Sequence, residues 1–239
     1  MPVLLIPVHN EQRHLPGVLE KAARIASTLV VVDDGSTDAT PGLLVEWARQ
    51  HPRCHLLLQP VNRGKSQALA QGLRVVDGLV QGGQVEGCAP LVLCDGDGQH
   101  DLEEVPPLCE SLSEQQLDML IAYRDFSRYP RHKVWGNRLL SWQARWLTGV
   151  AYVDSLCGLR VMRAGRAGEV ATLLTGPRYT CEQQMCVGLP RRGWRVANNF
   201  PVAPAHARSN PSWWDGAEIF CWGLASWLRG LRARSAPIS

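Results

Sequence analysis

A repeated alternation of short apolar runs with amphipathic stretches, through the first half of the chain, most strongly constrains its fold. In stretches such as 11–26 and 64–79, the apolar residues recur at helical spacing and form one face. Strands that alternate with helices predict βαβ units, a mostly parallel sheet and right-handed crossovers. The apolar runs that we predict as strands are residues 3–8, 29–32, 54–58, 91–94 and 119–122.

The composition fits one domain with a buried core. The chain has 239 residues, of which 45% are hydrophobic and 20% charged. These values exclude a mainly disordered chain. The formal net charge of +3 is too small to indicate nucleic-acid binding. We therefore predict a single-domain α/β protein with a Rossmann-like, mostly parallel sheet flanked by helices.

Cysteine, histidine and hydropathy patterns exclude three other classes of protein. The eight cysteines include no CxxC pair and the N-terminus lacks a basic signal region, so we expect reduced, mostly buried cysteines in a cytoplasmic protein. The seven histidines are scattered and predict no zinc site. The longest apolar run, 219–228, is far shorter than the roughly 20 residues of a membrane-spanning helix. We expect a soluble or peripheral protein.

Polar clusters follow three of the predicted strands. They are the segments 9–11 (HNE), 33–38 (DDGSTD) and 95–100 (DGDGQH). In an open parallel sheet, ligands bind outside the carboxyl ends of the strands, so these clusters should meet at one site. The first cluster contains no GxGxxG pattern, which disfavours a dinucleotide.

Asp95 and Asp97 are the sharpest chemical signal. Two carboxylates with Gly96 between them can turn toward one site, and Gln99 adds a neutral oxygen. Hard oxygen ligands suit Mg²⁺ or Mn²⁺, which also bind substrate phosphates. The alternative is a capped turn, because turns use Asp and Gly as well. The position after a buried strand, beside two other polar clusters, favours the metal site.

Two further segments offer ligand contacts. Asp34 follows the second strand, where an acid can bind a ribose or a base edge, while residues 36–38 would cap the next helix, with Thr40 at its N-cap. The turn 62–66 lacks the first glycine of a P-loop, so we reject that motif. Two interpretations of this turn stay open: a cationic turn in which Lys65 meets phosphates, or a solvated loop.

Together, these segments resemble family-two glycosyltransferases of the GT-A fold. The matching segments are 7–11 (PVHNE), 31–38 (VVDDGSTD), 62–69 (NRGKSQAL) and, most specifically, 95–108 (DGDGQHDLEEVPPL). The last segment is similar to the polyprenyl-phosphate sugar synthases, such as the dolichyl-phosphate mannose and glucose synthases. The later segments 154–160 and 192–196 agree, and the resemblance covers roughly residues 2–208.

The resemblance implies roles for the matching residues. A UDP- or GDP-linked sugar would be held at its base and ribose by Pro7, Val8 and Glu11. Asp34 would face the base, and Lys65 would meet the donor phosphates. Asp95 would lie near the ribose and the metal, while Asp97 and Gln99 would hold the Mg²⁺ or Mn²⁺. The residues that would gather an acceptor lipid phosphate are Arg124, Arg131 or Lys133, and Arg208.

The implied reaction is an inverting, metal-dependent transfer to a polyprenyl or dolichyl phosphate. The metal would stabilise the leaving diphosphate, and an ionised phosphate acceptor needs no strong base. Arginine binds phosphate in a bidentate fork, which positions it for attack. Two alternatives stay open. One is transfer to a hydroxyl of a soluble sugar or glycan, with Glu182 as the candidate base. The other is a nucleotide-sugar-binding protein without turnover.

The chain departs from the family at three places. Ser66 stands where a second glycine is common, and Cys157 stands where serine is common. Each change would alter a phosphate contact or only a packing detail. After Arg208 the family tends to have Gly-x-Ser, whereas residues 209–212 of this chain read SNPS.

Tryptophan is concentrated in the second half of the chain. Most of the nine tryptophans lie beyond residue 130. The spacing of Trp135, Leu139, Trp142 and Trp146 is that of one helix face, which would either pack in the core or lie at a membrane interface. For the Trp- and Arg-rich tail, 209–239, we expect an interfacial helix, with a homodimer contact as the alternative.

We expect one catalytic domain at residues 1–208. Within it, residues 1–122 would bind the nucleotide sugar and residues 123–208 the acceptor. A lipid acceptor would place the protein at the inner face of the cell membrane.

Overall fold

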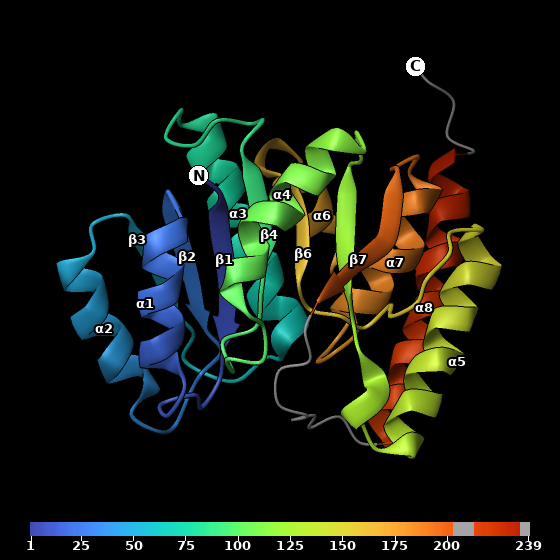
Figure 1. Ribbon diagram of the computed structural model, residues 1–239, viewed down its shortest axis with the longest axis horizontal. Coiled ribbons are helices and arrows are strands. Elements are labelled where there is room, and N and C mark those ends of the chain that lie inside the picture. The colour runs from blue at the N-terminus through green and yellow to red at the C-terminus, as the bar shows by residue number, and fades with distance from the viewer. Residues whose placement is uncertain (203–212, 235–239) are drawn as a thin grey trace.

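A seven-stranded sheet forms the centre of the molecule in the computed structural model, which describes residues 1–202 and 213–234 (Figure 1). The strand order across the sheet is β3-β2-β1-β4-β6-β5-β7, and every pairing except those of β6 is parallel. The predicted α/β class is confirmed. The strands are β1 (Val3–Val8), β2 (Thr28–Asp33), β3 (Cys54–Leu58), β4 (Pro90–Leu93), β5 (Met119–Arg124), β6 (Arg160–Arg163) and β7 (Val196–Val202).

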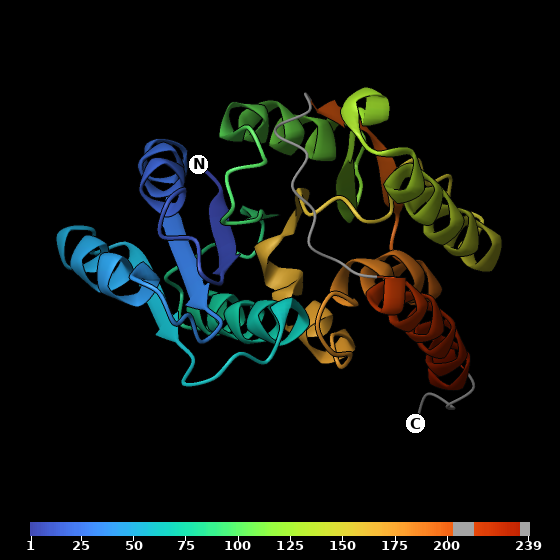
Figure 2. The same cartoon turned by 90° about the horizontal axis from the view of Figure 1, so that it is seen from below.

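Helices cover both faces of this sheet. Figures 1 and 2 show α1 and α4 on one face, and α3, α6 and α7 on the other. The helices are α1 (Leu15–Ile25), α2 (Thr40–Gln50), α3 (Lys65–Gln81), α4 (Val105–Glu114), α5 (Arg131–Thr148), α6 (Ala167–Leu173), α7 (Cys181–Arg191) and α8 (Trp213–Arg234), with the short 3₁₀ turns η1 (Leu102–Glu104), η2 (Phe126–Arg128) and η3 (Ala164–Arg166). Because β1 is covered on both sides, all six of its residues are buried.

The antiparallel strand β6 decides which loop reaches the carboxyl edge of the sheet. It lies between β4 and β5, and Arg160 at its start pairs with Leu93, the last residue of β4, and with Ile121 of β5. The loop 154–159 therefore enters at the edge where the parallel strands end. Alternation of strands and helices in the sequence did not predict this reversed strand.

Two helix starts differ from the predicted positions, that of α1 by four residues and that of α2 by one. Helix α1 begins at Leu15, because the carbonyl of Glu11 accepts hydrogen bonds from the amides of His14 and Leu15 and closes a turn before the helix. The N-cap of α2 is Ala39 rather than Thr40. The Thr40 hydroxyl instead accepts a hydrogen bond from the amide of Glu11, which joins the loops after β1 and β2.

The second half of the chain ends in helices with exposed tryptophans. On α5, Trp135, Trp142 and Trp146 are exposed, so of the two alternatives left open for this row, packing in the core is wrong. Within residues 1–202 and 213–234, no helix combines the length and the apolar composition that a bilayer crossing requires.

All eight cysteines are free thiols, and four of them are buried.

Candidate functional site

A cleft of about 1070 Å³ lies at the carboxyl edge of the sheet, the lower edge in Figure 1. The polar segments that follow β1, β2 and β4 meet there, together with the end of β5 and the start of α7. Most of the residues assigned from the sequence line this one cleft: Pro7, Val8, Glu11, Asp34, Lys65, Asp95, Asp97, Gln99 and Arg124.

Asp34 fixes a turn in the cleft wall. Its Oδ1 accepts a hydrogen bond from the amide of Arg63, and its Oδ2 accepts one from the amide of Gly64, both at 2.8 Å. Burial raises the pKa of Asp34, and these two hydrogen bonds offset only part of the rise. Both carboxylate oxygens thus serve the 62–64 turn while the residue lines the cleft.

Lys65 forms two ion pairs at the base of the cleft. Its Nζ lies 2.5 Å from Oδ1 of Asp95 and 2.6 Å from Oε1 of Glu182, and its side chain is only 19% exposed. Burial lowers the pKa of Lys65, but the two carboxylates raise it well above its usual value. Burial raises the pKa of both carboxylates, but Lys65 lowers it below the usual range. All three groups are therefore charged at neutral pH, and Lys65 does not lie in a solvated loop.

Asp95 is enclosed from two further directions. Its Oδ2 lies 3.4 Å from Nε2 of His100. Gly158, in the loop before β6, lies against the same carboxylate, where a Cβ atom would overlap it. Both oxygens of Asp95 are therefore turned toward protein groups.

Asp97 and Gln99 form a pair at the cleft surface. The backbone amide of Gln99 donates to Oδ1 of Asp97 at 3.0 Å, and its Nε2 donates to Oδ2 at 2.6 Å. Both side chains are partly exposed and line the cleft. A half-turn of the Gln99 amide would present its Oε1 at the same point, because the two ends of an amide have nearly the same shape.

This pair fits a divalent cation, whereas Oδ1 of Asp95 is paired with Lys65. A carboxylate and an amide oxygen are ligands that Mg²⁺ and Mn²⁺ accept when substrate phosphates complete the coordination. The part of the chain that the structure describes contains no cluster of three or more His, Cys, Asp or Glu side chains suited to a metal. The fit therefore depends on Asp97, Gln99 and oxygens from a ligand, with Asp95 paired to Lys65.

Arg124 is held rigidly on another wall of the cleft. Its Nε donates to Oδ2 of Asp154 at 2.7 Å and its Nη2 donates to Oδ1 at 3.0 Å, so the two side chains form a bidentate pair. Asp154 is fully buried, and Asn137 donates to its Oδ1 at 2.6 Å. Burial lowers the pKa of Arg124, but Asp154 raises it above its usual value. The guanidinium is permanently charged and fixed in orientation.

The support for Arg124 comes from residues to which the sequence assigned no role. Asn198 of β7 accepts hydrogen bonds from the amides of Val153 and Asp154, both at 2.7 Å, and donates to the carbonyl of Ala122 at 2.9 Å. These bonds tie the loop before β6 to the end of β5. The segment 154–160 was part of the family resemblance, which was a signal for Asp154, whereas Asn198 belongs to no quoted motif.

The other expected phosphate ligands lie in different places. Arg131 and Lys133 are in the first turn of α5, and the described lining of the cleft does not include them. Arg208 lies outside the described residues. Arg178 does line the cleft, with its Nε 3.3 Å from Oδ1 of Asp215. Sequence reasoning missed Arg178, because a single arginine before a helix carries no recognisable spacing.

Ser66 and Cys157, which depart from the family pattern, make packing contacts. The buried Ser66 hydroxyl accepts a hydrogen bond from the amide of Cys181 at 3.0 Å and donates to the carbonyl of Arg178 at 2.8 Å. Ser66 thus joins α3 to the start of α7. Cys157 is fully buried, and burial raises the pKa of its thiol to about 12, which keeps the thiol neutral.

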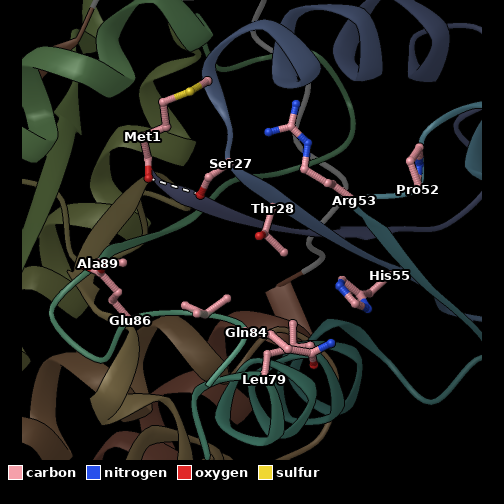
Figure 3. Close-up of a pocket in the computed structure, with 11 residues that line it drawn as sticks. Met1, Ser27, Thr28, Pro52, Arg53, His55, Leu79, Gln84, Glu86 and Ala89 are labelled. Carbon is pink, nitrogen blue, oxygen red and sulfur yellow. Dashed lines mark hydrogen bonds between the residues drawn. The ribbon is translucent and has the colours of Figure 1, made fainter. Parts of the chain in front are cut away.

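A second, smaller pocket of about 550 Å³ lies at the opposite edge of the sheet (Figure 3). Its lining includes Met1, Thr28, Arg53 and Ala89, which stand at or before the amino ends of the first four strands. None of the residues assigned from the sequence lines it. Ligands of such sheets bind at the carboxyl ends, so the cleft on that edge is the candidate site.

Sequence comparisons relate most of the chain to known proteins. A family model for glycosyl transferase family 2 matches residues 3–156. The undecaprenyl-phosphate mannosyltransferase of Micrococcus luteus is 29% identical over 248 residues, which cover 96% of this chain and 97% of that protein. The dolichyl-phosphate beta-glucosyltransferase of Trichomonas vaginalis is 35% identical over 217 residues, with 83% of this chain and 64% of that protein covered. The chain spans about half the length of several other relatives.

Solved structures share the fold. Glucosyl-3-phosphoglycerate synthase from Mycobacterium tuberculosis, in complex with Mn²⁺, UDP-glucose and phosphoglyceric acid, superposes with a TM-score of 0.66 at 19% identity, covering 100% of this chain and 81% of that one. A mannosyltransferase from Pyrobaculum calidifontis, in complex with GDP-mannose and Mn²⁺, has a TM-score of 0.57 at 17% identity, with coverage of 99% and 75%. At these identities the likeness concerns the fold alone.

Proposed function

Because the chain belongs to glycosyltransferase family 2, we propose that it transfers a sugar from a UDP- or GDP-linked donor to a polyprenyl phosphate, with inversion at the anomeric carbon. One observation carries the proposal. A single cleft is lined by Asp97 and Gln99, which fit a divalent cation, and by Arg124, which Asp154 holds in a fixed orientation. Such a displacement needs charge compensation at the leaving diphosphate and a fixed contact for the acceptor phosphate.

Relatives and neighbours support the donor and acceptor classes. The Micrococcus and Trichomonas relatives are named for undecaprenyl-phosphate and dolichyl-phosphate acceptors. The two solved structures contain Mn²⁺ with a UDP-linked and a GDP-linked sugar, respectively. We carry these classes to this chain as part of the proposal.

On the donor side, we assign Asp97 and Gln99 as ligands of Mg²⁺ or Mn²⁺. When bound, the cation would neutralise the negative charge that develops on the departing diphosphate. Lys65 would add a fixed positive charge next to Asp95. The base and ribose of the donor would lie against Pro7, Val8, Glu11 and Asp34, in the part of the cleft that residues 1–122 form.

On the acceptor side, an oxygen of the lipid phosphate attacks C1 of the sugar. The bond from C1 to the donor diphosphate breaks, and its electron pair leaves with the nucleoside diphosphate. Arg124 would orient the attacking phosphate, with Arg131, Lys133 and Arg208 as further proposed contacts within residues 123–208. The phosphate is ionised near neutral pH, so the step needs no proton acceptor.

The state of Glu182 favours a phosphate acceptor over a hydroxyl. Glu182 is paired with Lys65, and although burial raises its pKa, Lys65 and Arg160 bring it below the usual value. A general base works best with a pKa near the operating pH, which is the opposite shift. We therefore give Glu182 a role in holding Lys65.

We also propose that the reaction takes place at the cytoplasmic face of a membrane, where a lipid phosphate is available.

Two measurements test this function. A thermal-shift series with UDP- and GDP-sugars, each with Mn²⁺, should raise the melting temperature for one nucleotide class, because a ligand that binds only the folded state stabilises it. Radiolabelled sugar from that donor should then enter a polyprenyl phosphate, and EDTA should stop the transfer until Mn²⁺ or Mg²⁺ is restored. Unchanged transfer in EDTA contradicts the metal role, and transfer only to soluble hydroxyl acceptors contradicts the lipid phosphate.

A further inference from the structure

An apolar row is exposed along α5. The exposed fractions of Trp135, Leu139, Trp142 and Trp146 are 69%, 55%, 58% and 71%. Their spacing places them on one face of the helix. The Trp142 and Trp146 rings stack with their centroids 6.3 Å apart, so two of the three tryptophans form an aromatic pair on this face. A soluble monomer rarely exposes such a row without a partner.

Helix α8 carries a second exposed row. Trp214, Leu224 and Leu228 are 85%, 41% and 51% exposed, and Ala217 and Cys221 between them are exposed as well. The spacing of three and four residues again selects one helix face. The side chains from residue 229 onward are outside this description, so the row is defined by residues 214–228.

Both rows point away from the body of the protein. The inner faces of the two helices are joined to α7 and to each other. Gln183 of α7 donates to the Leu140 carbonyl and to Oε1 of Gln143 at 2.9 Å, and Gln143 donates to the Phe220 carbonyl at 2.8 Å. Gly223 lies against Gln143, where a Cβ atom would overlap the amide. Figures 1 and 2 show α5 and α8 side by side at one end of the molecule, and we call their two exposed rows together the α5–α8 face.

Basic residues border this face without acidic partners on the same helix. Arg138 and Arg145 are exposed on α5, seven residues apart and beside the tryptophan row, and Arg131 is exposed in its first turn. No aspartate or glutamate occurs from residue 131 to residue 148. A two-fold contact between copies pairs a patch with itself, so it would place these like-charged arginines close together, which is unfavourable. An anionic surface is complementary to their charge, and tryptophan and arginine together are typical of the bilayer interface.

We propose that the α5–α8 face is the surface by which this protein docks onto a membrane containing anionic lipid. The proposal rests on the proposed function in one respect, because a lipid phosphate acceptor requires access to a bilayer. Tyr129, two residues before α5, lines the cleft, so docking through α5 brings the membrane next to the acceptor side of the site. The tryptophan rings would lie among the headgroups, and Arg138 and Arg145 would contact lipid phosphates.

Vesicle sedimentation of the full chain tests the surface without any assay of activity. The probes are phosphatidylcholine vesicles with and without phosphatidylglycerol, at low and high salt. We expect binding to the mixed vesicles that weakens with salt. The variant Trp135→Ala/Trp142→Ala/Trp146→Ala should lose about tenfold or more in partitioning, because partitioning scales with buried apolar area. Arg138→Gln/Arg145→Gln should lose binding to the phosphatidylglycerol vesicles selectively.

A matched control removes exposed apolar side chains from the far end of the sheet. Leu43 and Leu58 are 37% and 46% exposed, and Leu43→Ala/Leu58→Ala should bind vesicles as the wild type does. The proposal is overturned if the wild type stays in the supernatant with both vesicles, or if the tryptophan variant binds as well as the control. It is also overturned if sedimentation velocity finds a dimer that this variant converts to monomers, since the face would then join two copies.

Transfer to a short-chain, water-soluble isoprenyl phosphate separates this proposal from the proposed function. The tryptophan variant should use this acceptor at the wild-type rate, because none of the three residues lines the cleft. If the protein binds vesicles but transfers sugar to no isoprenyl phosphate, the proposed function fails and the docking surface stands. If it transfers sugar but binds no vesicle, the docking surface fails alone.

Discussion

The Lys65 ammonium lies 2.5 Å from Oδ1 of Asp95. Lys65 begins α3, Asp95 follows β4, and Glu182, the second partner of Lys65, lies in the first turn of α7. One cation therefore links three elements that line the cleft. Removing the cation would leave two carboxylates close together and largely out of water. The stability of a variant without Lys65 should therefore depend strongly on whether these carboxylates are ionised.

The variant Lys65→Met should destabilise the fold more at about pH 8 than at about pH 5. In the wild type, folding lowers the pKa of Asp95 and Glu182, so both groups stabilise the fold at pH values above their unfolded pKa. This stabilisation is lost as the pH falls into the acid range. Without the ammonium, burial and mutual repulsion would raise the pKa of both groups, and a raised pKa costs stability as the pH rises. Urea unfolding at the two pH values should give a loss of about 3–5 kcal/mol at the higher pH.

The double variant Lys65→Met/Glu182→Gln is the control for the pH dependence. It removes one of the two repelling carboxylates, so it should be more stable than Lys65→Met alone at the higher pH. An equal loss for Lys65→Met at both pH values would mean that the charges of this cluster do not determine its stability.

The variant Asp97→Ala should lower the rate of transfer at saturating donor by about 10²–10³, the usual effect of removing one preorganised electrostatic group. Initial rates with Mn²⁺ measure this. The control is Glu103→Ala, an exposed carboxylate on η1 outside the cleft lining, which should keep the full rate. A fully active Asp97→Ala protein would refute the site.

The variant Asp154→Asn should raise the KM for the acceptor phosphate about tenfold and leave the KM for the donor unchanged, because an amide replaces the ionic, bidentate partner of Arg124. Arg124→Lys should give the same split, since lysine keeps the charge but not the fork. Steady-state kinetics with each substrate varied separately measures the split. A parallel rise in both KM values would assign Asp154 a general structural role.

The variant Ser66→Ala should lower the free energy of unfolding by about 1–2 kcal/mol, because the buried amide of Cys181 loses its acceptor. The KM for the donor should not change, since the hydroxyl contacts α7 and its preceding loop rather than the open cleft. Thermal unfolding and donor kinetics check the two halves of this prediction. A large rise in the donor KM would support the alternative that this position contacts phosphate.

Local patterns predicted two strands with their exact bounds, 3–8 and 54–58. The first is a fully buried apolar run in the interior of the sheet, which leaves little choice of conformation, whereas the second is a half-buried edge strand. The N-cap of α2 differs from the predicted Thr40 where the loops after β1 and β2 make contacts, such as that of the Glu11 amide with the Thr40 hydroxyl. These contacts join residues far apart in the sequence, which a local pattern does not contain.

The candidate site divides in the same way. The clusters at 95–99 and at Asp34 were found from the sequence because parallel strands bring their carboxyl ends to one edge. The pairing of Glu182 with Lys65 and of Asp154 with Arg124 was not predicted, because these carboxylates lie in α7 and in the loop before an antiparallel strand that periodicity did not predict. Asn198 acts through its side-chain amide, which binds the backbone of the loop before β6. No spacing in the sequence identifies such a residue.

The sequence by itself determined that this chain forms an α/β sheet with acidic clusters at one edge and that it resembles glycosyltransferases, because periodicity and motif spacing are properties of the chain itself. Only the tertiary structure decided which charges meet. It paired Lys65 with Asp95 and Glu182, left Asp97 and Gln99 at the cleft surface, and turned the tryptophans of α5 outward. A charge acquires its role from its neighbours and its burial, and both are set by contacts between distant segments.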